Sequence, residues 1–191
     1  MLFRSVDCDK QGECSMKIIK FGLTTKEIQS AIDAVELYKE NFQKKADTYR
    51  KRMAEEIAVY ASAYFDNSIM DDVVNGSPRK PDVKVDFSHK GDISVVVAYG
   101  EDAVWCEFGA GVYHNGSVGS SPNPYGKDLG FTIGSYGKGH GKQQAWGYYT
   151  DPESKTGLVI TRGTPASMPM YNAAQEVLRK SVEIAREVWG S

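Results

Sequence analysis

The sequence has few of the residues that build metal centres or covalent cross-links. Its three cysteines, Cys8, Cys14 and Cys106, include no C-x-x-C pair and are too few to complete a zinc site. The three histidines are scattered among segments that we expect to be turns or loops. We therefore expect free thiols, no metal and no cofactor.

Other absences exclude further classes of protein. No stretch approaches the roughly 18 consecutive apolar residues of a membrane span, and the N-terminal segment lacks the apolar core of a secretory signal. A formal net charge of −2 and a pI of about 5.9 give no general attraction to nucleic acid or to anionic membranes. We expect a soluble protein made in the cytoplasm, with no specific nucleic-acid or membrane partner.

The length of 191 residues suits one ordinary domain. Residues 1–15 are polar and show no periodicity, so we predict that they form a disordered leader or extension. The remaining residues, 16–191, are predicted to form a single α+β domain.

Glycine and proline are absent from Thr24 to Asn75, which leaves room for a long helix. Thr24 and Glu27 have the spacing of a capping box, and apolar residues then recur at helical intervals as far as Tyr64. The pattern predicts one helix of about 42 residues, or two helices with a break near Asn41. One such helix would be about 63 Å long, which exceeds a core of this size.

Shorter elements follow the helix. Residues 83–87 and 93–99 read as a β-hairpin, with His89 at its solvated tip, and 158–161 as a short strand. Residues 168–189 carry an apolar stripe at helical spacing and predict a closing helix. Pro169 is tolerated in the first turn of this helix, because the first amide has no partner within the helix.

The segment 109–147 contains eleven glycines, with aromatic residues between them. It is too rich in glycine for a helix and too aromatic for a plain linker, so we predict a flexible insertion loop that becomes ordered against a partner. Its run SYGKGHGK lacks the spacing of a phosphate-binding loop, which argues against nucleotide binding.

The stretch VWCEFGAG, residues 104–111, joins the two halves of the chain. Trp105 and Phe108 are expected to anchor it in the core, and Gly109 allows the backbone to turn. Glu107 lies between the two aromatics. We expect it to face solvent or an interface; the alternative is a buried carboxylate with a partner.

No arrangement of catalytic residues can be recognised. The sequence has no G-x-S-x-G elbow, the histidines lie in predicted turns, and Cys106 has no basic neighbour to activate it. Glu107 is the only acid in a conspicuous setting, whereas glycoside hydrolysis needs two carboxylates. We predict that the protein is not an enzyme and has no catalytic residues.

Two short motifs and the order of the elements resemble the tail-completion (head–tail joining, minor tail component) family of long-tailed bacteriophages. The family's V-E-F-G-T-like motif stands here as Trp105-Cys106-Glu107-Phe108-Gly109, with Ala110 where threonine is common. Its P-F-hydrophobic-x-x-A motif stands in residues 168–174, with Met170 where phenylalanine is usual. The residues of this resemblance are Trp105, Glu107, Phe108, Gly109, Gly163, Pro165, Met168, Pro169 and Tyr171.

The resemblance implies an α+β fold in which the long and closing helices pack on a small, mainly antiparallel sheet. It implies a structural component of the virion neck or tail, made in the bacterial host cytoplasm. The implied partners are further copies of itself, in a ring for which six copies are expected, and neighbouring neck or tail proteins. Glu107 and Phe108 would form a corner of the fold or a subunit contact.

Two other functions are compatible with the residues alone. One is an enzyme that uses the glycine-rich loop for a phosphorylated or sugar ligand. The other is a cytoplasmic binding module whose long helix pairs with a partner coiled coil, although Asp47 and Glu56 interrupt the apolar seam that such pairing needs.

Overall fold

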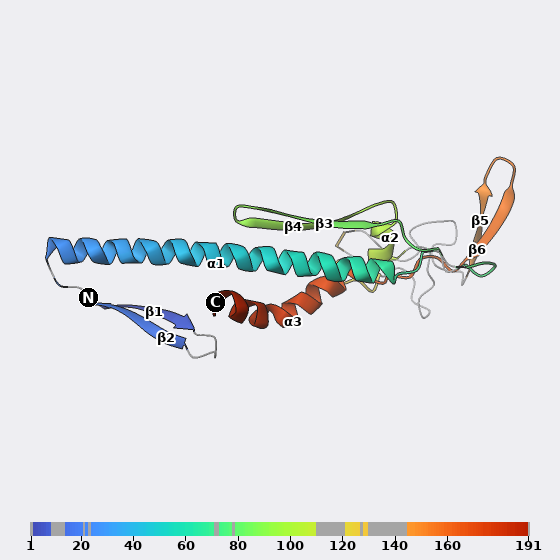
Figure 1. Cartoon of the computed structure of the whole chain (residues 1–191). Helices are drawn as coiled ribbons and strands as arrows, with labels where there is room; N and C mark the ends of the chain where they lie inside the picture. The colour runs from blue at the N-terminus through green and yellow to red at the C-terminus, as the bar shows by residue number, and fades with distance from the viewer. Residues whose placement is uncertain are drawn as a thin grey trace. The chain divides into compact units, whose positions relative to one another are not determined.

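The structure is a computed structural model that describes residues 2–8, 14–20, 22, 24–70, 73–77, 79–109, 121–126, 128–129 and 145–190. Side chains are described for these residues except 2–8, 14–20 and 146. Figure 1 shows the elements in chain order: β1 (Leu2–Cys8), β2 (Cys14–Lys20), α1 (Thr25–Asp66), β3 (Lys84–Lys90), β4 (Ile93–Tyr99), α2 (Ala103–Phe108), β5 (Trp146–Asp151), β6 (Thr156–Thr161) and α3 (Pro169–Trp189).

The predicted α+β class, with a long N-terminal helix and a C-terminal helix, is confirmed. The described strands form three two-stranded antiparallel sheets, β1-β2, β3-β4 and β5-β6, where we had expected one small sheet. Each sheet joins strands that are neighbours in the chain, so each is a hairpin. Helices and hairpins therefore alternate without the crossover connections of a parallel sheet.

The described residues divide into two compact units, and each is discontinuous in sequence. Unit 1 comprises Met1–Glu56, Phe87–Val95 and Val177–Ser191, and unit 2 comprises Ile57–Asp86 and Val96–Glu176. Helices α1 and α3 and the β3-β4 hairpin contribute residues to both. A single domain over residues 16–191 stays a prediction.

Helix α1 begins with the predicted capping box. The Glu27 amide donates to the Thr24 hydroxyl oxygen at 3.4 Å, and the Thr24 amide donates to the Glu27 carboxylate at 3.3 Å. These bonds satisfy amides that have no partner within the helix. The helix runs unbroken through Asn41 for 42 residues, so the single-helix prediction holds. Beyond its end, the Ser68 hydroxyl donates to the Tyr64 carbonyl at 2.8 Å.

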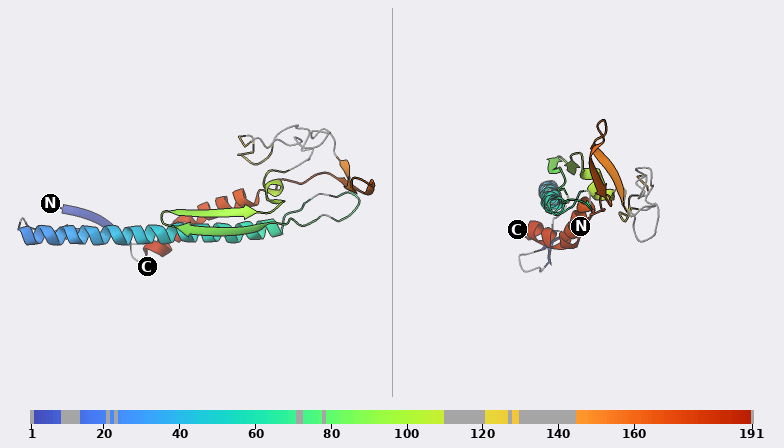
Figure 2. Two further views of the ribbon diagram at one scale, coloured as in Figure 1. Left: turned by 90° about the horizontal axis from the view of Figure 1, so that it is seen from above. Right: turned by 90° about the vertical axis from the view of Figure 1, so that its right-hand side faces the viewer.

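The predicted hairpin forms, and Figure 2 shows its strands side by side. Strand β4 has its predicted bounds, whereas β3 ends at Lys90 and not at residue 87. Gly91 and Asp92 form the turn, and Gly91 has a φ of 58°, a conformation that glycine adopts without a Cβ clash. Exposed and half-buried residues alternate along both strands, as a sheet packed on one face requires. His89 lies within β3 and not at the tip, a correction to the sequence analysis.

Residues 2–8 and 14–15 lie in paired strands, where we had predicted a disordered leader or extension. Strands β1 and β2 pair over their whole length, with Phe3 opposite Ile19 and Val6 opposite Met16. Strand β2 runs across the expected boundary at residue 16. Residues 1–15 contain only one of the two strands in full, so their composition could not reveal a pairing with the segment that follows.

Most of the predicted insertion loop, 109–147, lies outside the described residues, so its flexibility stays a prediction. Its end was assigned wrongly, because Trp146 opens β5, which pairs with β6. The sequence did not predict this strand, because Gly147 interrupts a short run that otherwise favours β-structure.

Each unit has its own packed side chains. In unit 1 the Trp189 ring lies 5.4 Å from Tyr49 and 6.2 Å from Phe42, centroid to centroid. In the same unit Arg52 and Glu187 form an ion pair at 2.6 Å. In unit 2 a cluster of Phe65, Met70 and Cys106 is buried, and a second layer packs against it: Val83, Val85, Ala98, Trp105 and Met170.

Candidate functional site

The two motif segments of the sequence meet in unit 2. The Cys106 carbonyl, in α2, accepts the Ser167 amide at 2.9 Å and the Met168 amide at 3.2 Å, just before α3 begins. The Ser167 hydroxyl also bonds the Ser68 hydroxyl, at 2.7 Å, which links this junction to the end of α1. Residues far apart in the chain thus form one polar junction, and it is our candidate site.

Glu107 is the centre of this junction. One carboxylate oxygen, Oε2, accepts the Met170 amide at 2.8 Å, and the other, Oε1, accepts the Tyr171 amide at 3.1 Å and the Asn123 side-chain amide at 2.8 Å. Met170 and Tyr171 lie in the first turn of α3, where backbone amides have no partner within the helix. A side chain from α2 therefore caps α3, and the helix dipole favours its negative charge.

The expectation that Glu107 faces solvent or an interface is wrong, because the residue is only 8% exposed. The alternative, a buried carboxylate with a partner, is what the structure shows. The expectation failed because the stretch is a helix: Ala103, Cys106 and Glu107 face inward together at helical spacing.

Burial raises the pKa of Glu107, and the bonds from Met170, Tyr171 and Asn123 act in the opposite direction. The neighbouring Cys106 is fully buried, and desolvation raises the pKa of its thiol to about 12. A thiol with such a pKa is a poor nucleophile. The junction therefore has the character of a structural contact.

The start of α2 is fixed by a second carboxylate that sequence reasoning missed. Asp102 accepts two bonds from the Arg79 guanidinium, at 2.6 and 2.9 Å, and one from the Asp82 amide at 2.8 Å. The Arg79 bonds hold the pKa of Asp102 below its usual value. Nothing in the local sequence indicates a pairing between residues this far apart.

Backbone geometry explains the glycines of the motifs. Gly109 has a φ of 78°, and a Cβ there would lie 3.1 Å from the Ala166 Cβ. Gly163 has a φ of 95°, also outside the range that side chains favour. Met168 adopts a φ of 54° although it is not glycine, and it precedes the buried Pro169, the first residue of α3. Pro165 is exposed.

The motif aromatics border the same junction. Trp105 packs against the buried cluster, and the Phe108 carbonyl accepts the Ser121 hydroxyl at 2.7 Å. The Tyr171 ring meets the Tyr125 ring edge-on at 6.2 Å. Asn123, another residue missed from sequence, is 2% exposed beneath them. Residues 121–126 of the insertion are therefore attached to α2 and α3.

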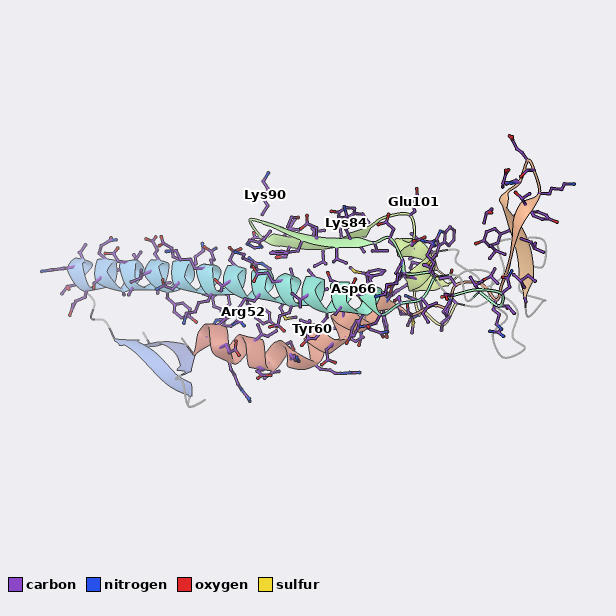
Figure 3. The ribbon with its side chains drawn as sticks, turned by 45° about the vertical axis from the view of Figure 1, so that its right-hand side comes forward. Arg52, Tyr60, Asp66, Lys84, Lys90 and Glu101 are labelled. Carbon is purple, nitrogen blue, oxygen red and sulfur yellow. The ribbon has the colours of Figure 1, made fainter. Side chains whose placement is uncertain are left out.

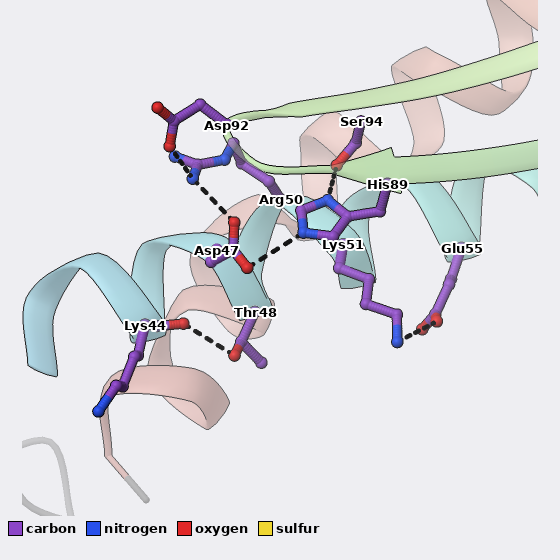
Figure 4. A network of polar contacts seen from close by, with 9 residues as sticks. All are labelled: Lys44, Asp47, Thr48, Arg50, Lys51, Glu55, His89, Asp92 and Ser94. Atoms are coloured by element: carbon purple, nitrogen blue, oxygen red, sulfur yellow. Dashed lines mark hydrogen bonds and ion pairs between the residues drawn. The ribbon is translucent and has the colours of Figure 1, made fainter.

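A separate polar network lies in unit 1, between α1 and the tip of the hairpin (Figure 4). His89 Nε2 lies 3.1 Å from Asp47 Oδ2, and His89 Nδ1 lies 2.8 Å from the Ser94 hydroxyl. Arg50 bonds both Asp47 and Asp92 at 3.1 Å. The His89 side chain is 15% exposed, so its predicted solvation is wrong. The bond from His89 lowers the pKa of Asp47.

In this network a carboxylate, an imidazole and a hydroxyl are bonded one after another, an arrangement that can transfer a proton from one group to the next. Its members come from the two elements that it joins, α1 and the hairpin. We interpret it as the contact that fixes the hairpin tip on the helix. Arg50 Nε is buried there without a hydrogen-bond partner among the described residues.

Within the described ranges, no group of three or more His, Cys, Asp or Glu side chains could hold a metal ion. In the same part of the chain, no helix has both the length and the apolar character needed to cross a membrane. Comparison with protein-family models, curated proteins and solved structures found no match.

Proposed function

We propose that the protein is a non-enzymatic structural component of a phage or prophage particle. It joins the head or neck to the tail, or completes the tail end, as one subunit of an oligomeric ring. The observation that carries the proposal is the junction at Glu107. The two motifs that resemble the tail-completion family are in direct contact there, through backbone and carboxylate hydrogen bonds.

The character of the junction supports a structural role. Its carboxylate bonds two backbone amides and one side-chain amide, and its thiol is held protonated by burial. A catalytic acid or nucleophile must reach a substrate, whereas the Glu107 carboxylate is bonded to amides of the protein itself and the Cys106 thiol donates to the Met70 sulfur.

The surface of α1 supports assembly with other subunits. Its N-terminal half, in unit 1, leaves several large apolar side chains more than a third exposed: Ile28, Ile32, Leu37, Tyr38 and Phe42. Ile28, Ile32 and Phe42 share one face of the helix at helical spacing, and an exposed apolar face is typical of an interface with another protein chain.

Deletion of the gene from a phage or inducible prophage that carries it tests the proposal. Electron microscopy of the lysate should show heads and tails that fail to join or tails that are incomplete, and the intact gene supplied in trans should restore infectious particles. Mass spectrometry should detect the protein in purified particles. Normal particles and an unchanged titre after deletion would refute the proposal.

A further inference from the structure

Residues 73–75 lie beside β6 in unit 2. A β-bridge at Val73 and a bond from the Val74 amide to the Ile160 carbonyl, 2.7 Å long, join the segment to the strand. Figure 3 shows the chain running from Asp66, the last residue of α1, to the orange β5-β6 hairpin. The segment therefore covers part of the edge of β6, which would otherwise present unpaired backbone groups.

Asn75 continues this pairing with its side chain in place of its backbone. Its Oδ1 accepts the Ile160 amide at 3.0 Å, and its Nδ2 donates to the Leu158 carbonyl at 2.9 Å. One planar amide thus donates one bond to the strand and accepts one from it, as the backbone of a paired strand does. The residue is exposed, so water reaches it.

The residue after Asn75 is glycine, and an Asn-Gly pair is chemically reactive. The glycine nitrogen can attack the carbonyl carbon of the asparagine side chain, because glycine has no Cβ to obstruct the approach. The new bond closes a succinimide ring, the bond from that carbon to Nδ2 breaks, and the glycine amide proton leaves with Nδ2 as ammonia. Water then opens the ring to aspartate or isoaspartate. The sequence contains one other such pair, Asn115-Gly116.

We propose that Asn75 is a deamidation site that its two hydrogen bonds to β6 protect in the folded protein. Ring closure requires the side-chain amide to turn its carbonyl carbon toward the Gly76 nitrogen. The amide is free to turn only when both bonds to the strand break. The rate of deamidation in the folded protein is therefore set by local opening of this segment.

Loss of the amide prevents the contact from forming again. In aspartate a carboxylate oxygen takes the place of Nδ2 and faces the Leu158 carbonyl oxygen, which is also an acceptor. In isoaspartate the backbone gains a methylene group, which shifts the segment along β6. Deamidation should therefore release residues 73–75 from the strand. This inference does not depend on the proposed function.

The test follows deamidation of the full-length protein at pH 8 by peptide mass spectrometry, in buffer and in guanidinium chloride. Asn115 is the internal reference, since both asparagines lie in the same tripeptide, Asn-Gly-Ser. The two sites should react at similar rates in denaturant. In buffer Asn75 should react at least about tenfold more slowly than in denaturant, since two hydrogen bonds must break first. Equal rates at Asn75 in the two solutions, or no reaction there in denaturant, would overturn the proposal.

Variants test the consequence of the modification. Asn75→Asp reproduces one product, and hydrogen-exchange mass spectrometry should show several-fold faster exchange at residues 156–161, because the Ile160 amide loses a stable acceptor. Ser77→Asp is the matched control, since it adds the same charge at an exposed position two residues later. It should leave the exchange nearly unchanged. Unchanged exchange in Asn75→Asp, or equal effects of the two variants, would contradict the release of the segment.

Discussion

Glu107 is a buried carboxylate, and burying a charged group is costly unless it has hydrogen-bond partners. Its three donors, two backbone amides of α3 and the Asn123 side chain, compensate for the water that it has lost. A shorter side chain would leave these donors without their acceptor in a partly buried site. The residue therefore connects three segments of unit 2 through hydrogen bonds alone.

Glu107→Ala should lower the free energy of unfolding by about 2–4 kcal/mol, because it leaves three buried or partly buried donors without an acceptor. Urea denaturation followed by circular dichroism measures this loss. Glu101→Ala, at an exposed position in the turn before α2, should change the free energy of unfolding by less than about 0.5 kcal/mol. Equal effects of the two substitutions would contradict the capping role.

The two buried carboxylates of unit 2 should give opposite pH dependences. The pKa of Glu107 is raised in the folded state, so its contribution to stability is complete below its unfolded pKa and is lost as pH rises through the folded value. The pKa of Asp102 is lowered, so its contribution is complete above the unfolded pKa and is lost as pH falls through the folded value.

Denaturation from pH 3 to 7 should therefore show the stability advantage of the parent over Glu107→Gln shrinking as pH rises. Its advantage over Asp102→Asn should grow over the same range. Parallel trends for the two variants would show that one of the two pKa directions is wrong.

Cys106 should resist alkylation while the protein is folded. Its side chain has no exposed surface, and its pKa of about 12 leaves almost no thiolate at pH 8. Peptide mass spectrometry after iodoacetamide treatment should find this residue unmodified in the native protein and modified in urea. Rapid native labelling would contradict its burial.

At the scale of elements, the hairpin β3-β4 depends on contacts made by few side chains. Its tip is held to α1, within unit 1, by the bonds that join His89 to Asp47 and Asp92 to Arg50. Neither contact follows from the alternation that predicts the strands. The tip should therefore be able to open while the hydrogen-bonded strands stay paired.

His89→Ala should increase amide hydrogen exchange several-fold at residues 87–95, because the opening of the tip becomes easier. Lys90→Ala, on the exposed face one residue later, should leave those rates nearly unchanged. Hydrogen-exchange mass spectrometry compares the two variants directly. Unchanged exchange in His89→Ala would show that the network does not restrain the hairpin.

At the scale of the whole molecule, β4 and the first half of α1 leave large apolar side chains exposed to water. Burying them against another chain would stabilise the protein. A ring would supply this burial and would couple folding to assembly. Association that involves only the folded state stabilises that state by mass action.

The thermal midpoint of the protein should therefore rise with protein concentration. Differential scanning calorimetry over a hundredfold range of concentration measures this trend. A midpoint independent of concentration in the parent would argue against assembly of the free protein.

Local sequence was sufficient for the elements whose signals lie within a few residues of each other. The capping box at Thr24 and the absence of glycine and proline predicted α1. Alternation of apolar and polar residues predicted β3, and β-branched residues predicted β4. Apolar residues at helical spacing after Pro169 predicted α3. The bounds of α1, β4 and α3 agree with the prediction because helix and hairpin hydrogen bonds join near neighbours in the chain, whereas β3 runs to Lys90, beyond its predicted end at residue 87.

The tertiary structure alone decided the features that depend on distant partners. Glu107 was assigned to the surface because its donors lie in α3 and in the insertion, and His89 because Asp47 lies on α1. The β1-β2 hairpin and β5 were missed for the same reason, since each strand is recognised by its pairing. A charged or polar residue has no periodicity that reveals its partner, so only the folded chain shows whether it is buried.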